Sequence, residues 1–186
     1  HRATEQTMSI SLILQYEVLS RLVFKPIKEI FGGKLKFAIC GGAPLSEDLG
    51  TLFSLMGIDV LVGYGLTETF AAVTINTIKH QKAGTVGKPI GDVKIKFDVD
   101  GEILVKTKKA LKEYYKNPQA TAEAFTEEGY FRTGDIGEFT EEGYLKITDR
   151  KKDLIKTSGG KYVAPQKIEN MLKQNASISQ VLVVGD

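Results

Sequence analysis

The stretch 64–68, which reads YGLTE, places an aromatic ring, a hydroxyl and a carboxylate directly after the apolar run 58–62. A hydroxyl can bond a phosphate oxygen, a carboxylate can hold Mg²⁺, and a tyrosine ring can cover a flat base. Ligands of open α/β sheets bind beyond the ends of such strands. The alternative is a structural turn, because the stretch matches neither G-x-G-x-x-G nor G-x-x-x-x-G-K-[ST].

A second candidate is Asp135, which follows a glycine at the end of the aromatic stretch 130–135, YFRTGD. A carboxylate in this position can accept hydrogen bonds from two neighbouring ribose hydroxyls. The competing interpretation is an Asx turn, in which the side chain bonds only its own backbone.

A third candidate is the basic segment 149–165, DRKKDLIKTSGGKYVAP. Arg150 is placed to reach a ribose or a phosphate, and Lys156 follows six residues later on an expected strand. Gly159 and Gly160 permit close approach of the backbone to a ligand. The competing interpretation is a solvated basic loop.

The first part of the chain predicts a parallel α/β unit. Residues 8–24 have apolar positions at helical spacing, and Pro26 is expected to limit that helix. The order that follows is an apolar strand over 35–40, a helix capped by Ser46, and a buried strand over 58–62. The apolar face of the first helix favours core packing or a further domain over peripheral membrane contact.

After residue 84 the sequence pattern changes and predicts an antiparallel β-layer. Alternating residues over 93–99 and the Asp100-Gly101 turn predict one hairpin, and 136–148 predicts a second. Between them, Asn117-Pro118 predicts the start of a short helix. Farther along, 165–174 predicts a helix and 181–184 a buried strand.

Composition excludes several classes of protein. The formal net charge of +2 gives no general attraction to nucleic acid, and no apolar run reaches the length of a transmembrane helix. The one cysteine, Cys40, cannot form an internal disulfide, which favours a reducing compartment such as the cytoplasm. Its apolar neighbours predict a buried structural thiol, with a reactive thiol as the alternative.

Taken together, the motifs GGAP at 41–44, YGLTE at 64–68, TGD at 133–135 and the basic segment resemble the adenylate-forming superfamily. That superfamily includes acyl-CoA ligases, luciferases and the adenylation domains of peptide synthetases. Residues 36–45 and 114–125 look most like long-chain fatty-acid–CoA ligases. The resemblance implies fatty acid, ATP and CoA as substrates and Mg²⁺ as the metal.

The resemblance also implies a nucleotide site. Tyr64 would stack on adenine with Gly65 beside it, Thr67 would bond the α-phosphate, and Glu68 would bind Mg²⁺. Asp135 would hold the ribose hydroxyls. The remaining residues implied for this site are Gly41, Gly42 and Ala43, which would line it through backbone, and Arg150, which would assist at the ribose.

A mobile small domain is implied beyond this site. Lys152 would be the hinge between the two domains, and Gly159 and Gly160 would line the CoA channel near Lys156. The expected divisions are the end of the large α/β domain over 1–84, an antiparallel subdomain over 85–148, and the hinge with the start of a small α+β domain over 149–186.

The phosphate loop and the adenylating lysine of the superfamily have no match here, so the chain is expected to be a piece of a longer enzyme and inactive alone, with self-association through bared apolar surface. One alternative is an adenylate-forming enzyme that transfers its acyl group to a carrier protein. A different alternative is a non-catalytic fragment that only binds a nucleotide or a partner.

Overall fold

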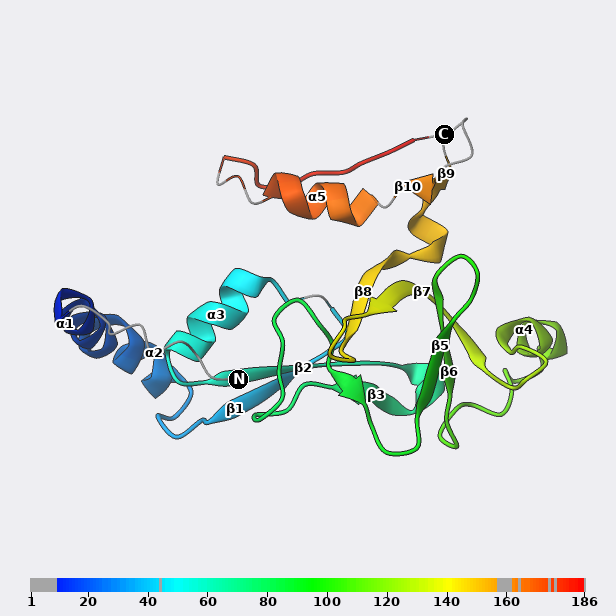
Figure 1. The fold of residues 1–186 in the computed structure, drawn as a ribbon, viewed down its shortest axis with the longest axis horizontal. Coiled ribbons are helices and arrows are strands. Elements are labelled where there is room, and N and C mark those ends of the chain that lie inside the picture. The colour runs from blue at the N-terminus through cyan, green and yellow to red at the C-terminus, as the bar shows by residue number, and fades with distance from the viewer. Residues whose placement is uncertain are drawn as a thin grey trace. The chain divides into compact units, whose positions relative to one another are not determined.

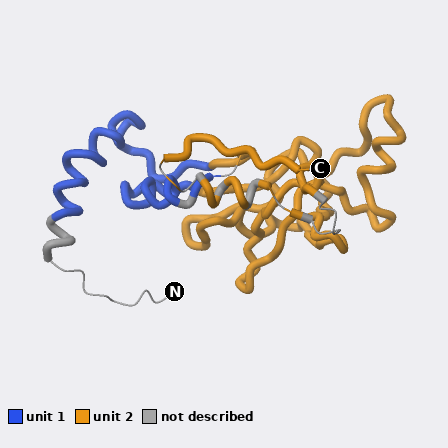
Figure 2. The backbone as a smooth tube through the Cα atoms, turned by 90° about the horizontal axis from the view of Figure 1, so that it is seen from above, with its two compact units in different colours: residues 1–39, 45–60 blue, residues 40–44, 61–186 orange. Residues whose placement is uncertain are grey.

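The computed structural model describes residues 10–43, 45–156, 162–163, 165–173, 175 and 177–185. Figure 1 shows their helices and strands in chain order. The chain divides into two compact units, one made of residues 1–39 and 45–60, the other of residues 40–44 and 61–186 (Figure 2). We describe each unit by itself.

The first unit begins with a helical segment that continues beyond the expected limit. It runs through α1 (Ile10–Leu19), a π-helical turn (Ser20–Phe24) and α2 (Lys25–Ile30). Pro26 does not end the helix, because it lies in the first turn of α2, where a missing N–H and a fixed φ are tolerated. Residues 8 and 9 of the predicted helix lie outside the described residues.

The predicted strand and helix that follow are confirmed. β1 (Phe37–Cys40) starts two residues later than expected and leads to α3 (Glu47–Leu55). Ser46 caps α3, since its Oγ accepts a hydrogen bond from the N–H of Leu49 at 3.3 Å. Gly57 ends the helix at a φ of 75°, a conformation that glycine adopts at little cost.

The strand that was expected to end at residue 62 continues farther. β2 (Asp59–Leu66) includes Tyr64 and Gly65, with a register shift between them. β3 (Ala71–Ile75) returns antiparallel to β2, and β4 (Lys88–Pro89) pairs antiparallel with β3. The strand order of this sheet is β1-β2-β3-β4.

Gly65 lies in β2, at the register shift where this strand passes close to β3. A Cβ at residue 65 would lie 2.3 Å from the backbone oxygen of Ala71, so the glycine allows close approach of two strands. The structural turn considered as an alternative for residues 64–68 is therefore a strand through residue 66, and β3 and β4 were not predicted.

The second sheet confirms the antiparallel layer predicted within 85–148. It contains β5 (Lys94–Phe97), β6 (Glu102–Lys106), β7 (Phe131–Phe139) and β8 (Leu145–Arg150), in that order and all antiparallel. Both predicted hairpins are present. The short helix α4 (Pro118–Ala124) is capped as expected by Asn117, whose Oδ1 accepts from the N–H of Ala120 at 3.0 Å.

The core of the second unit contains side chains from both sheets. Ile103, Val105 and Leu145 have no exposed surface at all, and Val73 is almost as buried. The phenol ring of Tyr64 belongs to the same cluster. Burial of these side chains is the main favourable term that holds the strands together.

The C-terminal elements are short. A 3₁₀ turn (Lys151–Asp153) leads into β9 (Ile155–Lys156), which pairs antiparallel with β10 (Tyr162–Val163), and α5 (Pro165–Lys173) follows. Lys156 therefore lies on a strand, as expected.

The prediction of a buried strand at 181–184 was wrong. Leu182 and Val184 are each 79% exposed, and the N–H of Val183 donates to Oε1 of Glu169 at 2.9 Å where a strand partner would be needed. A run of aliphatic residues favours a strand only when another strand pairs with it. No helix of the described residues combines the length and apolar character needed to cross a membrane.

Candidate active site

Three of the predicted residues come together from three separate strands. The hydroxyl of Tyr64 on β2 donates to Oδ2 of Asp135 on β7 at 2.6 Å, although the two are 71 positions apart. Arg150 on β8 is the register partner of Asp135, and its Nε lies 3.3 Å from Asp135 Oδ1. The Asp135 carboxylate therefore lies between a phenol and a guanidinium.

The burial of Tyr64 and Asp135 determines the protonation state of the phenol. Tyr64 and Asp135 are 8% and 5% exposed. Desolvation, reinforced by the negative charge of Asp135, raises the pKa of Tyr64 far above its ordinary value. The phenol thus stays protonated and remains a hydrogen-bond donor over the physiological pH range. A carboxylate held in this way is a hydrogen-bond acceptor with a fixed orientation.

The burial of Tyr64 also bears on its predicted stacking with adenine. Its ring packs in the core of the second unit, with little surface left for a ligand. Stacking therefore stays a prediction. The contact that the structure gives to this tyrosine is the bond from its hydroxyl to Asp135.

We expect Tyr64→Phe to lower the stability of the full-length protein by about 1–3 kcal/mol, because a buried carboxylate loses its donor. Affinity for ATP should fall as well, since Asp135 is then less firmly placed. Denaturant unfolding and calorimetric titration with ATP would measure both effects. Tyr115→Phe is the matched control, because Tyr115 is 83% exposed. Equal stability and affinity in the two variants would contradict the role given to the Tyr64 hydroxyl.

Thr67 and Glu68 lie on a tight turn directly after β2. Residues Thr67–Thr69 form a 3₁₀ turn, and Phe70 follows with a φ of 62°. The buried Thr69 fixes this turn, since its Oγ1 accepts from the N–H of Leu66 at 3.0 Å and donates to the carbonyl of Ala71 at 2.9 Å. Thr67 is consequently exposed and Glu68 is half-buried.

Glu68 has a defined neighbour. Tyr114, in the loop before α4, donates its hydroxyl to Glu68 Oε1 at 3.1 Å. The pKa of Tyr114 is raised, first by burial and then by this hydrogen bond. The half-buried carboxylate of Glu68 and the exposed hydroxyl of Thr67 are both hard oxygen donors. Such donors fit Mg²⁺, which is commonly bound by one or two carboxylates together with phosphates of the substrate.

Gly41, Gly42 and Ala43 lie in the exposed segment directly after β1. A Cβ at residue 41 would lie 3.2 Å from the backbone oxygen of Gly63, so this glycine permits close approach to β2. Gly42 has a φ of 84°, which a residue with a side chain adopts only at a cost. The backbone here is accessible, as the predicted lining role requires.

Glu102 is a residue that the sequence analysis missed. It lies at the start of β6 and is 3% exposed. Its Oε1 accepts from the N–H of Gly134, beside Asp135, at 3.0 Å. Its Oε2 accepts from Arg132 at 3.2 Å and from Lys151 at 2.8 Å. One buried carboxylate therefore joins the Asp135 turn to the residue that follows Arg150.

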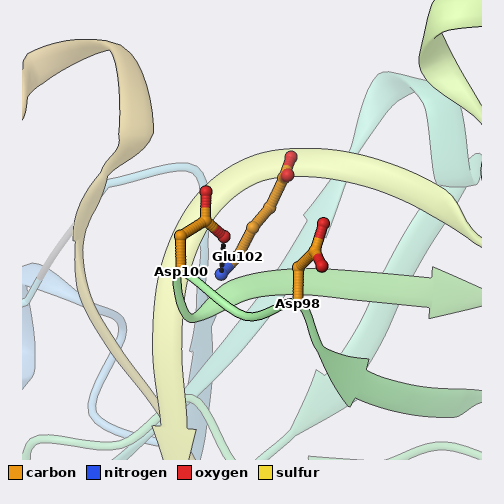
Figure 3. A group of neighbouring side chains, drawn as sticks. All are labelled: Asp98, Asp100 and Glu102. Carbon is orange, nitrogen blue, oxygen red and sulfur yellow. Dashed lines mark hydrogen bonds between the residues drawn. The ribbon is translucent and has the colours of Figure 1, made fainter.

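Asp98 and Asp100 lie near Glu102 in the β5–β6 turn (Figure 3). Asp100 Oδ1 accepts from the N–H of Glu102 at 3.1 Å, and its Oδ2 lies 2.6 Å from Lys151 Nζ. Arg132 lies 2.7 Å from Asp98 Oδ2. Hydrogen bonds from these cations lower the pKa of both aspartates. The acidic group is neutralised by side chains of the protein, and we do not interpret it as a metal site.

An Asp-x-Asp-x-Glu pattern at 98–102 is visible in the sequence and could have drawn attention to this turn. The cations that face it come from β7 and from the segment after β8, so pairing could not be inferred before the sheet was known.

The predicted hinge and CoA residues are less fully described. Lys152 is exposed in the 3₁₀ turn after β8, a suitable place for a pivot. Lys156 lies in β9. Gly159 and Gly160 lie outside the described residues.

Residues 11–115 match the family of AMP-binding enzymes, and this match covers more than half of the chain. The chain therefore belongs to the AMP-binding enzyme family, in agreement with the resemblance to adenylate-forming enzymes.

Two similar proteins within the family are named for fatty acids and CoA. The chain is 44% identical over 172 residues to the long-chain-fatty-acid–CoA ligase FadD15 of Mycobacterium bovis, covering 92% of this chain and 28% of the relative. A solved fatty acyl CoA synthetase of Mycobacterium tuberculosis is 37% identical, with a TM-score of 0.63 over 83% of this chain and 34% of that one.

A third comparison extends the likeness to a more distant enzyme. The O-succinylbenzoate CoA synthetase of Bacillus subtilis, solved with ATP and magnesium ion, has a TM-score of 0.73 and 27% identity over 87% of this chain and 38% of that one. The chain spans a little over a quarter of the length of the ligase that it matches at 44% identity.

Proposed function

We propose that the full-length protein is an ATP-dependent long-chain fatty-acid–CoA ligase. The observation that carries the proposal is the convergence of Tyr64, Asp135 and Arg150 from three strands, in a chain of the AMP-binding enzyme family. The long-chain substrate is supported by the names of relatives at 37–44% identity.

The reaction has two steps. A carboxylate oxygen of the fatty acid attacks the α-phosphorus of ATP, and the bond from that phosphorus to the pyrophosphate oxygen breaks. The products are acyl-adenylate and pyrophosphate. The thiolate of CoA then attacks the acyl carbon, and AMP leaves with the bonding electrons, which gives the thioester.

This chain supplies much of the nucleotide side of the first step. Asp135, held by Tyr64 and Arg150, accepts from the ribose hydroxyls and fixes the nucleotide. Thr67 donates to the α-phosphate, and Glu68 holds Mg²⁺. When bound, Mg²⁺ neutralises charge that develops on the phosphates. Catalysis in such a step is mainly positioning and charge stabilisation, so no general base is assigned.

The second step uses the region after β8. In this proposal Lys152 is the pivot of a small domain that follows β8, and Gly159 and Gly160 line the CoA channel near Lys156. The exposed position of Lys152 directly after the Asp135–Arg150 pair supports the assignment. Rotation there would change access to the acyl-adenylate and leave the ribose contacts in place.

The exposed apolar side chains of the first unit favour packing against a further part of the full-length protein. Leu22 and Ile30 are 73% and 81% exposed. Peripheral membrane contact and self-association are the other uses of such a surface.

The proposal is tested by ATP–pyrophosphate exchange with the full-length gene product and a panel of short-, medium- and long-chain acids. We expect exchange to be fastest with long-chain acids. No exchange with any acid would overturn the assignment as an adenylate-forming enzyme. Faster exchange with short- or medium-chain acids than with long-chain acids would keep the adenylation and overturn the long-chain substrate.

Gly160→Leu is expected to separate the two steps. A leucine side chain would fill space that only backbone can leave free for CoA, so acyl-CoA formation should fall strongly while pyrophosphate exchange stays near wild type. Both rates are measured on the same preparation. If Gly160→Leu abolishes exchange and thioester formation equally, Gly160 does not belong to a channel used only in the second step.

A further inference from the structure

Tyr114 lies outside the predicted nucleotide site, yet its hydroxyl contacts the carboxylate that we assign to Mg²⁺. The hydroxyl donates to Glu68 Oε1 at 3.1 Å, across 46 positions of sequence. The neighbouring Tyr115 is 83% exposed. Of these two adjacent tyrosines, one therefore points to Glu68 and the other to solvent.

The position of Tyr114 is fixed by its own backbone. Its N–H donates to Thr121 Oγ1 of α4 at 2.9 Å, and its carbonyl accepts from the N–H of Asn117 at 3.0 Å. Asn117 is also the cap of α4. The loop that carries the phenol is therefore attached to a short, well-capped helix.

The same loop is attached to the Glu68 turn by a second bond. The N–H of Leu111 donates to the backbone oxygen of Glu68 at 2.7 Å. Side chain and backbone of Glu68 are thus both held by the segment 111–114. On its other side the turn is fixed by Thr69.

The bond to Tyr114 has a consequence for metal binding. An ionised carboxylate offers about four lone-pair positions on its two oxygens. A donor that occupies one position on Oε1 restricts rotation of the carboxylate and leaves Oε2 to face a cation. Partners of this kind orient metal ligands in many sites, and their loss typically costs about 10–100-fold in metal affinity or activity.

We infer that Tyr114 is a positioning residue for Mg²⁺ in the nucleotide site. It holds the Glu68 carboxylate in the orientation that binds the Mg²⁺ of the ATP complex. The inference rests on the proposed function, because it assigns the metal to Glu68.

The test is binding of ATP to the full-length protein, without fatty acid or CoA, by calorimetry over a series of Mg²⁺ concentrations. In Tyr114→Phe the ring stays and only the donor is lost. We expect the Mg²⁺ concentration for half-maximal ATP binding to rise about 10–100-fold. Tyr115→Phe should behave as wild type.

A merely structural role would lower the unfolding midpoint of Tyr114→Phe and leave its Mg²⁺ requirement unchanged, which would overturn the inference. A double-mutant cycle gives a second criterion. Once Glu68→Gln has removed the charge, adding Tyr114→Phe should raise the Mg²⁺ requirement little further. Full additivity of the two effects would also overturn it.

Failure of the proposed function gives a different result. If the wild-type protein binds no ATP at any Mg²⁺ concentration, the nucleotide site itself is wrong, and the role of Tyr114 falls with it. If wild type, Tyr115→Phe and Tyr114→Phe all bind ATP with the same Mg²⁺ requirement, only the inference about Tyr114 is wrong.

Discussion

Glu68→Gln in the full-length protein is expected to slow ATP–pyrophosphate exchange on the order of 100- to 1000-fold. The substitution removes one negative charge from the metal site and keeps the shape of the side chain, so charge stabilisation in the transition state is lost. The turn itself should survive, because Thr69 holds it and the glutamine oxygen can still accept from Tyr114. The exchange rate at saturating fatty acid is the measurement.

The matched control is Glu113→Gln. Glu113 is exposed and adjacent to Tyr114, and the chemical change is identical. We expect this variant to exchange at the wild-type rate. Near-normal exchange in Glu68→Gln would show that Glu68 is not the metal ligand.

Among substitutions of glycine by alanine in this chain, Gly87→Ala is expected to lower the stability of the fold most. Gly87 is buried with a φ of 89°, and a Cβ there would lie 1.9 Å from the backbone carbon of Ile75. Neither backbone can move freely, because the oxygen of Gly87 accepts from the N–H of Leu145 at 2.8 Å and Ile75 of β3 pairs with Lys88 of β4 and Gly63 of β2. We expect a loss of about 3–5 kcal/mol of stability, at the severe end for a point mutation.

Gly143→Ala separates the clash from the conformational cost. Gly143 has a φ of 78°, but a Cβ there meets nothing within 4 Å. Its substitution should cost only about 1–2 kcal/mol, the penalty of the left-handed conformation. Denaturant unfolding of both variants of the full-length protein measures the difference. Equal losses would contradict the close packing that we assign to Gly87.

Features with local causes could be predicted from the sequence. Ser46 and Asn117 cap their helices as expected, because capping depends on a side chain and the next few N–H groups. The Asp100-Gly101 turn and its two strands follow from alternation and turn chemistry. The antiparallel layer could be predicted for the same reason.

Features that depend on contacts between residues far apart in the sequence could not be predicted from it. Tyr64 and Asp135 each stand in a recognisable motif, but their hydrogen bond depends on two sheets folding together. Gly65 looks like a turn residue until β3 is known to pass beside it. The strand at 181–184 failed because a hydrophobic run says nothing about whether a partner strand exists.

The resemblance implied a joint role for Asp135 and Arg150 at a ribose, and that role stays a prediction. The structure brings the two residues into register on neighbouring strands. Glu102 and Tyr114 were not predicted, because their hydrogen bonds to Gly134 and Glu68 join residues far apart in the sequence.

The most direct test of the central claim is product analysis after full-length protein is incubated with ATP–Mg²⁺, a long-chain fatty acid and CoA. The account predicts acyl-CoA, AMP and pyrophosphate in equal amounts, no product when ATP or the fatty acid is left out, and no acyl-CoA or AMP turnover when CoA is left out. Release of ADP and phosphate, or acyl-adenylate that never passes to CoA, would contradict assignment as an AMP-forming fatty-acid–CoA ligase.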